Sequence, residues 1–360
     1  MNSRVAELRR LAGRARCTAV LVSSPVDVEY VSGFRATNAY LLISSRRGIL
    51  FTDFRYRSAA QRFCSRRREW RFVEVGESSF EAIARAVKPG DRVGIQSGSL
   101  TVDQYDRLRR KCRHAKLVKL GNAISSVNAV KLPGEIAAMH RAARIGDRAL
   151  AAFARDVRPG MSEIAAARML DDLCAEGGSE GPSFETIVLF GPRTALPHGR
   201  PSQRKLHKGD WVLCDFGCTV DGLYSDMTRT MVAGMPSEKQ KRIYDIVYRA
   251  QRAARRAVKA GIRSCDVDAR ARGVIADAGY GDAFGHATGH GVGRRIHERP
   301  RLGRNDKTIL TENMVVTVEP GIYVPGEGGV RIEDMVAVTP RGGRCLTHAP
   351  RELIELGFRT

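Results

Sequence analysis

Three histidines, His286, His290 and His297, lie within twelve residues of the segment GHATGHGVGRRIHERP at 285–300. Clustered imidazoles can bind a metal ion, transfer protons or pack in a core, and their spacing alone does not decide between these roles. Histidines four residues apart would share a helical face, but four glycines between positions 285 and 293 make a helix unfavourable. The segment therefore predicts a glycine-rich loop or an irregular strand, whose catalytic partners come from elsewhere in the chain.

Four carboxylates lie in two predicted β-hairpins. Asp215 and Asp226 flank a short VDG turn, which would place both side chains on one face, directly opposed or diagonal. Glu319 and Glu333 flank the loop VPGEG at 324–328 and are expected to oppose each other on adjoining strands. Like charges on one face destabilise a sheet, and burial removes their hydration, so such a group needs cations or protons.

Two divalent metal ions would balance four carboxylates. A set rich in oxygen donors with one imidazole suits Mn²⁺, Fe²⁺, Co²⁺ or a catalytic pair of Zn²⁺ ions better than a structural zinc site. Two such ions about 3.5–4 Å apart can activate a shared water molecule and polarise a neighbouring carbonyl. A single acid of this kind more often caps a turn or pairs with an arginine. Four acids in paired register beside a histidine segment predict metal-assisted hydrolysis.

The elements that would position these residues fall into two regions. Residues 1–120 alternate short apolar runs with helical patterns, which predicts an α/β domain with a mixed sheet. Glycine, serine, asparagine and proline gather at 121–135, and we place the domains at 1–127 and 128–360. The second region has four predicted helices, of which the third begins at the capping-box pair Ser237 and Gln240 and ends at Gly261.

Composition indicates a globular protein of two domains, since 360 residues with 43% hydrophobic content can bury a large core. The N-terminal apolar run is far shorter than the roughly 20 residues that span a bilayer, so we expect a cytoplasmic location and no membrane partner. Eight scattered cysteines without a CxxC pair predict reduced thiols.

The net charge of +21 is concentrated near the N-terminus, where residues 1–125 hold 25 Lys and Arg against 11 Asp and Glu. This basic region lacks interleaved aromatic residues and any nucleic-acid-binding motif. A solvated basic face or a subunit contact explains it better than a nucleic-acid partner.

Five stretches resemble the pita-bread metallopeptidases, and within them the Xaa-Pro aminopeptidase and prolidase branch. They occur in the order typical of that family and span most of residues 130–350: ALPHGRPS (195–202), CDFGCTVDGLYSDMTRT (214–230), GHATGHGVGRRIHERP (285–300), VVTVEPGIYVPG (315–326) and GGVRIEDMVAVT (328–339). The resemblance implies an α/β (α+β) fold, with a C-terminal pita-bread domain preceded by a smaller creatinase-like α/β domain with a mixed sheet.

The resemblance also implies two divalent metal ions, Mn²⁺ first, with Co²⁺, Fe²⁺ or Zn²⁺ as alternatives. Asp215 is similar to the bidentate ligand of one ion, and Asp226 and Glu333 to the bridging carboxylates. His290 matches the single imidazole ligand, and Glu319 the ligand that also carries the proton of the bridging water. The resemblance implies that three histidines hold the scissile carbonyl, the oxyanion and the leaving nitrogen: His198, His286 and His297. Implied residues that shape the acid cluster and the substrate pocket are Arg331 and Tyr323.

Two positions depart from the family pattern. Arg294 and Arg295 stand where an apolar residue and an acid are usual. They would either bind an acidic group or the C-terminal carboxylate of a substrate, or point to solvent. Asn313 stands where the family often has proline, and we expect it to change a turn and leave the site intact.

We expect a homodimeric metallo-aminopeptidase that removes the residue preceding proline from peptides with proline at the second position. The alternative with the same chemistry is a prolidase restricted to Xaa-Pro dipeptides, a choice that depends on loops of the N-terminal domain. The N-terminal domain and ALPHG disfavour a methionine aminopeptidase, and five competent ligand residues disfavour a metal-free creatinase-like hydrolase. A non-catalytic binding protein on the same fold is a remote alternative, because such relatives would lose ligands.

Overall fold

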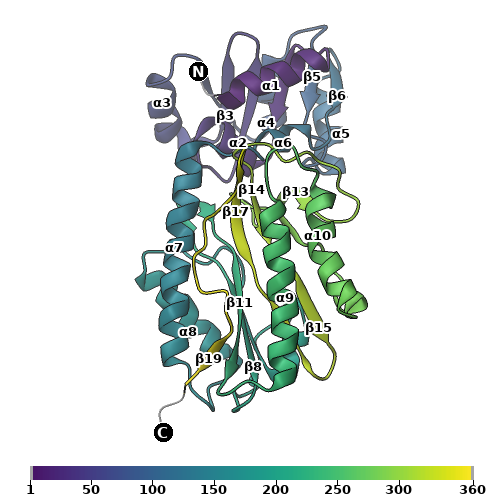
Figure 1. The fold of residues 1–360 in the computed structure, drawn as a ribbon. Coiled ribbons are helices and arrows are strands. Elements are labelled where there is room, and N and C mark those ends of the chain that lie inside the picture. Colours follow the sequence, from purple (N-terminus) through teal and green to yellow (C-terminus); the bar gives the residue numbers. More distant parts are fainter. Residues whose placement is uncertain (1–2, 358–360) are drawn as a thin grey trace. The chain divides into compact units, whose positions relative to one another are not determined.

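The structure is a computed structural model that describes residues 3–357. The chain divides into two compact units between Asn128 and Ala129, and each unit has its own sheets (Figure 1). Within the described residues, no helix is long and apolar enough to cross a membrane.

The N-terminal unit is built on a six-stranded sheet in the order β4-β3-β2-β1-β5-β6. The central strands β1, β2 and β3 pair antiparallel, and the remaining pairs are parallel, which confirms the predicted mixed sheet. The strands are β1 (Ala19–Val22), β2 (Ala39–Ser44), β3 (Gly48–Thr52), β4 (Trp70–Glu74), β5 (Arg92–Ile95) and β6 (Lys116–Lys119).

Helices cover both faces of this sheet. Alternate residues of a strand face opposite sides, so Val20 and Val22 of β1 enter one core while Ala19 and Leu21 enter the other. The first core receives α1 (Ser3–Arg14), α2 (Pro25–Ser32), α3 (Arg57–Ser65) and α6 (Ala123–Val127). The second core receives α4 (Ser79–Ala86) and α5 (Val102–Lys111). A short 3₁₀ helix, η1 (Phe54–Tyr56), precedes α3.

The C-terminal unit consists of two halves, each a sheet covered by a pair of helices (Figure 1). In the first half, α7 (Pro133–Asp156) and α8 (Glu163–Glu176) share a core with the sheet β19-β11-β8-β7. In the second half, α9 (Glu238–Ala257) and α10 (Ser264–Asp277) share a core with the sheet β13-β12-β14-β17-β18.

The strands of the first half are β7 (Ile187–Phe190), β8 (Trp211–Phe216), β11 (Met227–Ala233) and β19 (Ile354–Leu356). Those of the second half are β12 (Gly289–Gly291), β13 (Glu298–Leu302), β14 (Val315–Val318), β17 (Asp334–Thr339) and β18 (Gly342–Cys345). Each half also contains a short hairpin: β9 (Thr219–Val220) with β10 (Leu223–Tyr224) follows β8, and β15 (Gly321–Val324) with β16 (Gly328–Arg331) follows β14. The remaining 3₁₀ turns are η2 (Gly191–Ala195) and η3 (Gly281–Ala283).

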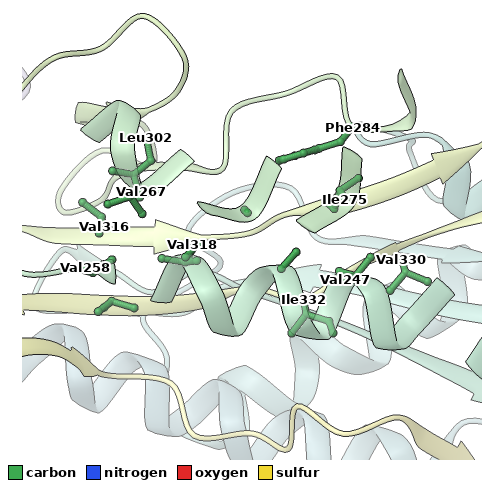
Figure 2. Packing of buried hydrophobic residues seen from close by; sticks show 14 of the residues in the cluster. Val247, Val258, Val267, Ile275, Phe284, Leu302, Val316, Val318, Val330 and Ile332 are labelled. Atoms are coloured by element: carbon green, nitrogen blue, oxygen red, sulfur yellow. The ribbon is translucent and has the colours of Figure 1, made fainter. Parts of the chain in front are cut away.

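Helix α9 shows how the sequence builds the second half. Its N-terminus carries the predicted capping box, in which Ser237 and Gln240 exchange side-chain and backbone hydrogen bonds. Its apolar face packs beside α10 and against the sheet, with Val247, Ile275, Val318 and Ile332 in one cluster (Figure 2). The predicted end at Gly261 is wrong, because the helix stops at Ala257 and Gly261 (φ 89°) belongs to the following turn.

Candidate metal centre

Three of the four acids lie where the predicted long strands are interrupted. Asp226 falls between β10 and β11, Glu319 between β14 and β15, and Glu333 between β16 and β17. The pairs β14–β17 and β15–β16 continue one register across their interruption, so Glu319 stands opposite Glu333. On the other sheet, Thr228 pairs with Asp215, which makes Asp226 diagonal to Asp215.

At Glu333 the interruption lets the two halves bond to each other, whereas Glu319 bonds within its own half. The backbone N–H of Glu333 donates to the carbonyl of Thr228 in β11 (3.1 Å), and that of Glu319 donates to the carbonyl of Thr288 (2.8 Å). A Cβ on Gly217, just after β8, would lie 1.9 Å from the carbonyl oxygen of Ser225. Glycine is therefore required there if the backbone before Asp226 is to pass so close.

His290 brings an imidazole to the acids. Its Nε2 lies 3.2 Å from Glu319 Oε1 and 3.6 Å from Asp226 Oδ2, while its Nδ1 contacts the carbonyl of Gly291 at 3.0 Å. A bond from Nδ1–H to that carbonyl leaves the Nε2 lone pair directed at the carboxylates, as a metal ligand requires. Ligand atoms of Asp226, His290 and Glu333 all lie within 4.8 Å of one another.

The acids repel one another in a place that is mostly shielded from water. Burial, followed by the charges of its acidic neighbours, raises the pKa of Asp226 and that of Glu333 well above their ordinary values. Burial also raises the pKa of Asp215, although the nearby Arg331 opposes this. Without cations these groups favour protons, so the cluster is suited to an environment that supplies positive charge.

Glu319 behaves differently from the other three acids. Burial acts to raise its pKa, but the hydrogen bond and charge of His290, with help from His286 and Arg331, lower the pKa to about 2. In return, Glu319 raises the pKa of His290 against the opposing effect of burial. Glu319 is therefore the carboxylate in this cluster that stays ionised.

Two buried carboxylate oxygens show that the side chains of this cluster suit metal ions. Asp215 Oδ1 and Glu333 Oε1 are buried, and neither has a hydrogen-bond partner among the described residues. A buried carboxylate oxygen without a partner is costly unless a cation approaches it. Together with Asp226, His290 and Glu319 they form a donor set of carboxylate oxygens and one imidazole, which suits divalent ions of the Mn²⁺ type.

Arg331 links the acids to the histidines. Its guanidinium donates to Asp215 Oδ2 (2.5 Å), Thr228 Oγ1 (2.9 Å) and Tyr323 Oη (2.9 Å). The hydroxyl of Tyr323 then contacts His286 Nε2 at 2.8 Å, while His286 Nδ1 contacts the carbonyl of Ala287. Burial lowers the pKa of His286, so its ring is neutral at pH 7 and accepts the Tyr323 proton donor at Nε2.

The other two predicted histidines interact with the histidines of the site. The ring of His297 packs edge-on to His290 with 4.5 Å between centroids, and burial followed by the charge of His290 lowers its pKa. His198 lies exposed on the loop after η2, where its charge contributes to lowering the pKa of both His286 and His297. The structure thus gathers all the residues proposed from the sequence, although His198 acts on the others only electrostatically.

Two threonines belong to the site and were missed. Thr228 donates to Glu333 Oε2 (2.6 Å), and Thr317 donates to Glu319 Oε1 (3.1 Å) while accepting from the His290 backbone (3.0 Å). Each threonine stands two residues from a ligand acid, Asp226 or Glu319. Residues two apart in a strand face the same side, so the sequence could have predicted both threonines from their distance to the acids.

The structure gives Arg294 a role that neither expectation covered. Its guanidinium donates to the carbonyls of Asp221 (2.9 Å) and Gly222 (3.4 Å), so it holds the tip of the β9–β10 hairpin. Arg295 is half-buried, and its backbone N–H donates to Glu298. Asn313 adopts a left-handed conformation (φ 67°), which asparagine tolerates, in the turn before β14.

Comparison with known proteins identifies the fold and its family. Residues 137–340 match the model of metallopeptidase family M24, and residues 4–130 match the creatinase/prolidase N-terminal domain. The chain belongs to metallopeptidase family M24. This confirms both the resemblance and the two-domain pita-bread fold predicted from the sequence.

Relatives in the family are similar over nearly their whole length. The "Xaa-Pro dipeptidase" of Pyrococcus furiosus is 35% identical, with 98% of this chain and 100% of the relative covered. The solved "Xaa-Pro dipeptidase from Bacillus anthracis" is 36% identical with a TM-score of 0.93, covering 98% of this chain and 99% of that one. An X-Pro aminopeptidase from Thermotoga maritima is 31% identical with a TM-score of 0.87, covering 98% and 99%. As an M24 member, the chain is a hydrolase of a family that uses divalent metal ions.

Proposed function

We propose that this M24 member is an Xaa-Pro dipeptidase that holds two divalent metal ions. Mn²⁺ is the first choice of metal, and Co²⁺, Fe²⁺ and Zn²⁺ are the alternatives. The proposed ligands are Asp215, Asp226, His290, Glu319 and Glu333. The observation that carries the proposal is the convergence of these donors at one buried place, with Asp215 Oδ1 and Glu333 Oε1 left without a protein partner among the described residues. A stabilising structural role would satisfy those oxygens, whereas a metal site leaves them open.

The ions would supply Lewis-acid activation of a water molecule and of the scissile carbonyl. The proposed proton acceptor is Glu319, which is ionised because its pKa is lowered to about 2 and which lies 3.2 Å from His290. In an Xaa-Pro bond the proline nitrogen carries no hydrogen, so the leaving amine must receive a proton. A Glu319 carboxyl that has taken a proton from the attacking water can return it to that nitrogen.

The histidines and Tyr323 orient the substrate around that transfer. His286 and His297 have lowered pKa values and are neutral at pH 7, so each ring can donate one N–H and accept one proton donor. The Arg331–Tyr323–His286 chain fixes where the Tyr323 hydroxyl and the His286 ring point. Because the His286 N–H and the Tyr323 O–H already have acceptors, His297 is the ring we expect to donate to negative charge that develops on the carbonyl oxygen.

Relatives favour the dipeptidase over the aminopeptidase that we expected first. The Pyrococcus furiosus and Bacillus anthracis proteins are named Xaa-Pro dipeptidases and are similar to this chain from end to end. Exopeptidase action on longer peptides is the second candidate, because the Thermotoga maritima protein of the same fold is named an X-Pro aminopeptidase. The two activities share all the site chemistry above and differ only in the length of peptide that the site admits.

The test uses protein stripped of metal and reconstituted separately with Mn²⁺, Co²⁺ and Zn²⁺, with Ala-Pro and Ala-Pro-Ala assayed side by side. Metal-dependent cleavage of Ala-Pro alone supports the dipeptidase. Release of alanine from Ala-Pro-Ala at a comparable rate replaces it with the aminopeptidase. If no metal gives cleavage of either peptide beyond that of Asp226→Asn, the proposed function is wrong.

Two further expectations stay proposals. Homodimerisation is tested by light scattering on the eluted full chain, where twice the 39.6 kDa chain mass is the expected result. A cytoplasmic location is consistent with the eight cysteines, all of which are free thiols. Cell fractionation checks it directly.

A further inference from the structure

Lys131 is a buried lysine near the start of the C-terminal unit, outside every motif that carries the site. Its side chain is 0% exposed, and its Nζ lies 2.7 Å from Glu298 Oε2 and 3.2 Å from the carbonyl of Ala129. Its backbone N–H donates to the carbonyl of Asn313 at 2.8 Å. A lysine is seldom buried unless it has a charged partner, so this position requires an explanation.

The partner, Glu298, holds the segment that leads to His297. Its Oε1 accepts from the backbone N–H groups of Arg294 and Arg295, both at 3.1 Å, while its Oε2 faces Lys131. The Glu298 carboxylate therefore binds the backbone of its own loop with one oxygen and Lys131 with the other. Without a counter-charge, a side chain that is only 7% exposed could not remain ionised there at low cost.

Other bonds also hold this segment, since the Gly293 carbonyl accepts from the Tyr224 N–H (2.8 Å) and the Arg294 guanidinium donates to the Asp221 carbonyl (2.9 Å). The segment contains the glycines of GHGVG, and its register against β12 shifts at the bulge between His290 and Gly291. A Cβ on Gly291 would lie 2.3 Å from the carbonyl oxygen of Arg299, so the two strands approach closely at this point. Such a segment is positioned by specific bonds more than by side-chain packing, and the Glu298 carboxylate supplies two of them.

We propose that Lys131 is a positioning residue of the peptidase site. Through Glu298 it fixes the 293–298 segment and so sets the His297 ring edge-on to His290, where substrate is held. This inference rests on the proposed function for its effect on turnover. The effect on the segment itself does not depend on any activity.

The experiment compares four variants of the full chain. Lys131→Met leaves the carboxylate without its cation, and Glu298→Gln keeps the Oε1 acceptor but leaves the ammonium without its anion. The double variant Lys131→Met/Glu298→Gln removes both charges and keeps the acceptor. Lys239→Met is the matched control, because Lys239 forms an ion pair of the same length with Glu327 but is 61% exposed.

The first readout is amide hydrogen exchange, measured on metal-loaded protein. We expect the Arg294 and Arg295 amides to exchange about tenfold faster in either single variant. Each variant breaks the Lys131–Glu298 ion pair, which holds the acceptor of these amides in place. The double variant should return towards the wild-type rate, and Lys239→Met should equal wild type. Metal content per chain should stay that of wild type in all four.

The second readout is the kinetics of Ala-Pro cleavage. Misplacement of His297 should lower kcat by about 10- to 100-fold in the single variants with a smaller change in KM, and the double variant should recover part of it. Unchanged amide exchange at Arg294 and Arg295 together with an unchanged kcat per metal-loaded site would overturn the proposal. If Lys131→Met does not fold, Glu298→Gln carries the same comparison. Wild-type protein that cleaves neither peptide refutes the proposed function, while the exchange result still decides whether Lys131 fixes the segment.

Discussion

Arg331 and Asp215 form a buried ion pair, with Nη2 and Oδ2 2.5 Å apart and neither side chain more than 13% exposed. The same guanidinium reaches Thr228 and Tyr323, so one cation from β16 orders groups from β11 and β15. Burial opposes the charge of Arg331, but the neighbouring Tyr323 and the acids raise its pKa well above the ordinary value. Arg331 is therefore a permanent charge that opposes the rise of the Asp215 pKa caused by burial and holds the Asp215 Oδ2 atom in place.

Replacing Arg331 separates charge from geometry. Arg331→Met should weaken metal binding about 10- to 100-fold, since Asp215 loses the group that orients it. Arg331→Lys keeps the charge but loses the planar fork that reaches three partners, so we expect it to stay far below wild type in kcat/KM. Calorimetric metal titration and Ala-Pro kinetics measure both effects. Arg141→Met, which breaks the exposed pair between Arg141 and Asp221, is the control and should behave as wild type; near-normal metal affinity in Arg331→Met would contradict the role.

The stability of the metal-free protein should depend on pH in an unusual direction. Asp226 and Glu333 have raised pKa values in the folded chain, so the folded state binds their protons more tightly than the unfolded state. Their favourable contribution is present below their ordinary values near pH 4 and is lost as pH rises towards the raised folded values. Glu319, with its pKa of about 2, acts oppositely and loses its contribution as pH falls from its ordinary value to 2.

Thermal unfolding with and without chelator checks this dependence. We expect Mn²⁺ to stabilise the protein more at pH 7 than at pH 5, because fewer protons compete with the ions for the carboxylates at pH 7. Asp226→Asn should raise the Tm of metal-free protein at pH 7 by about 2–4 °C for each kcal/mol of repulsion removed, although it abolishes activity. A metal-free wild type that is as stable as Asp226→Asn at pH 7 would argue against the crowding of charge described for this cluster.

Local sequence signals predicted the elements of the second half because they depend on neighbouring residues. The Ser237–Gln240 capping box and the face formed by Ile243, Ile246 and Val247 are properties of one helix, and α9 has both. The predicted end of that helix was wrong because a glycine is a common C-terminal cap, and the sequence does not show whether Gly261 caps the helix or lies in a later turn. Which turn it closes depends on the bond from its N–H to Leu310, and that residue is distant in sequence.

The two-residue period of strands and the lengths of the turns predicted which acids lie together. They did not predict that the strands are interrupted at those acids. A pattern such as MVVTVEPGIYV predicts one strand, whereas the chain breaks it at Glu319, whose N–H bonds to Thr288. Such a break is stable only because a segment distant in sequence supplies the missing partner. The same applies to Lys131, whose significance appears only when Glu298, 167 residues later, is beside it.

The chain from Arg331 through Tyr323 to His286 should control the acid side of the pH profile. Tyr323 donates to His286 Nε2, which opposes protonation of that nitrogen, and burial lowers the pKa of the ring further. Tyr323→Phe removes the donor, so the His286 pKa should rise and the acid limb of kcat/KM should move to higher pH. Loss of the positioned hydroxyl should also lower kcat about 10- to 100-fold. An acid limb that stays in place would show that His286 does not set it.

Gly217 tests whether the strand interruption before Asp226 positions that acid. A Cβ there would lie 1.9 Å from the Ser225 carbonyl oxygen and 2.1 Å from Ser183 Oγ, and backbone cannot yield as a flexible side chain does. Gly217→Ala should therefore push the Ser225–Asp226 backbone away, lower the stability by about 3 kcal/mol or more, and weaken metal binding. Gly273→Ala is the matched control, since a Cβ in that position of α10 meets nothing within 4 Å, and it should stabilise the helix by about 0.5–1 kcal/mol. Denaturant unfolding of both variants, followed by metal titration of the folded protein, measures the effects. Equal stability and metal affinity in the two variants would mean that the close approach at Gly217 does not hold Asp226 in place.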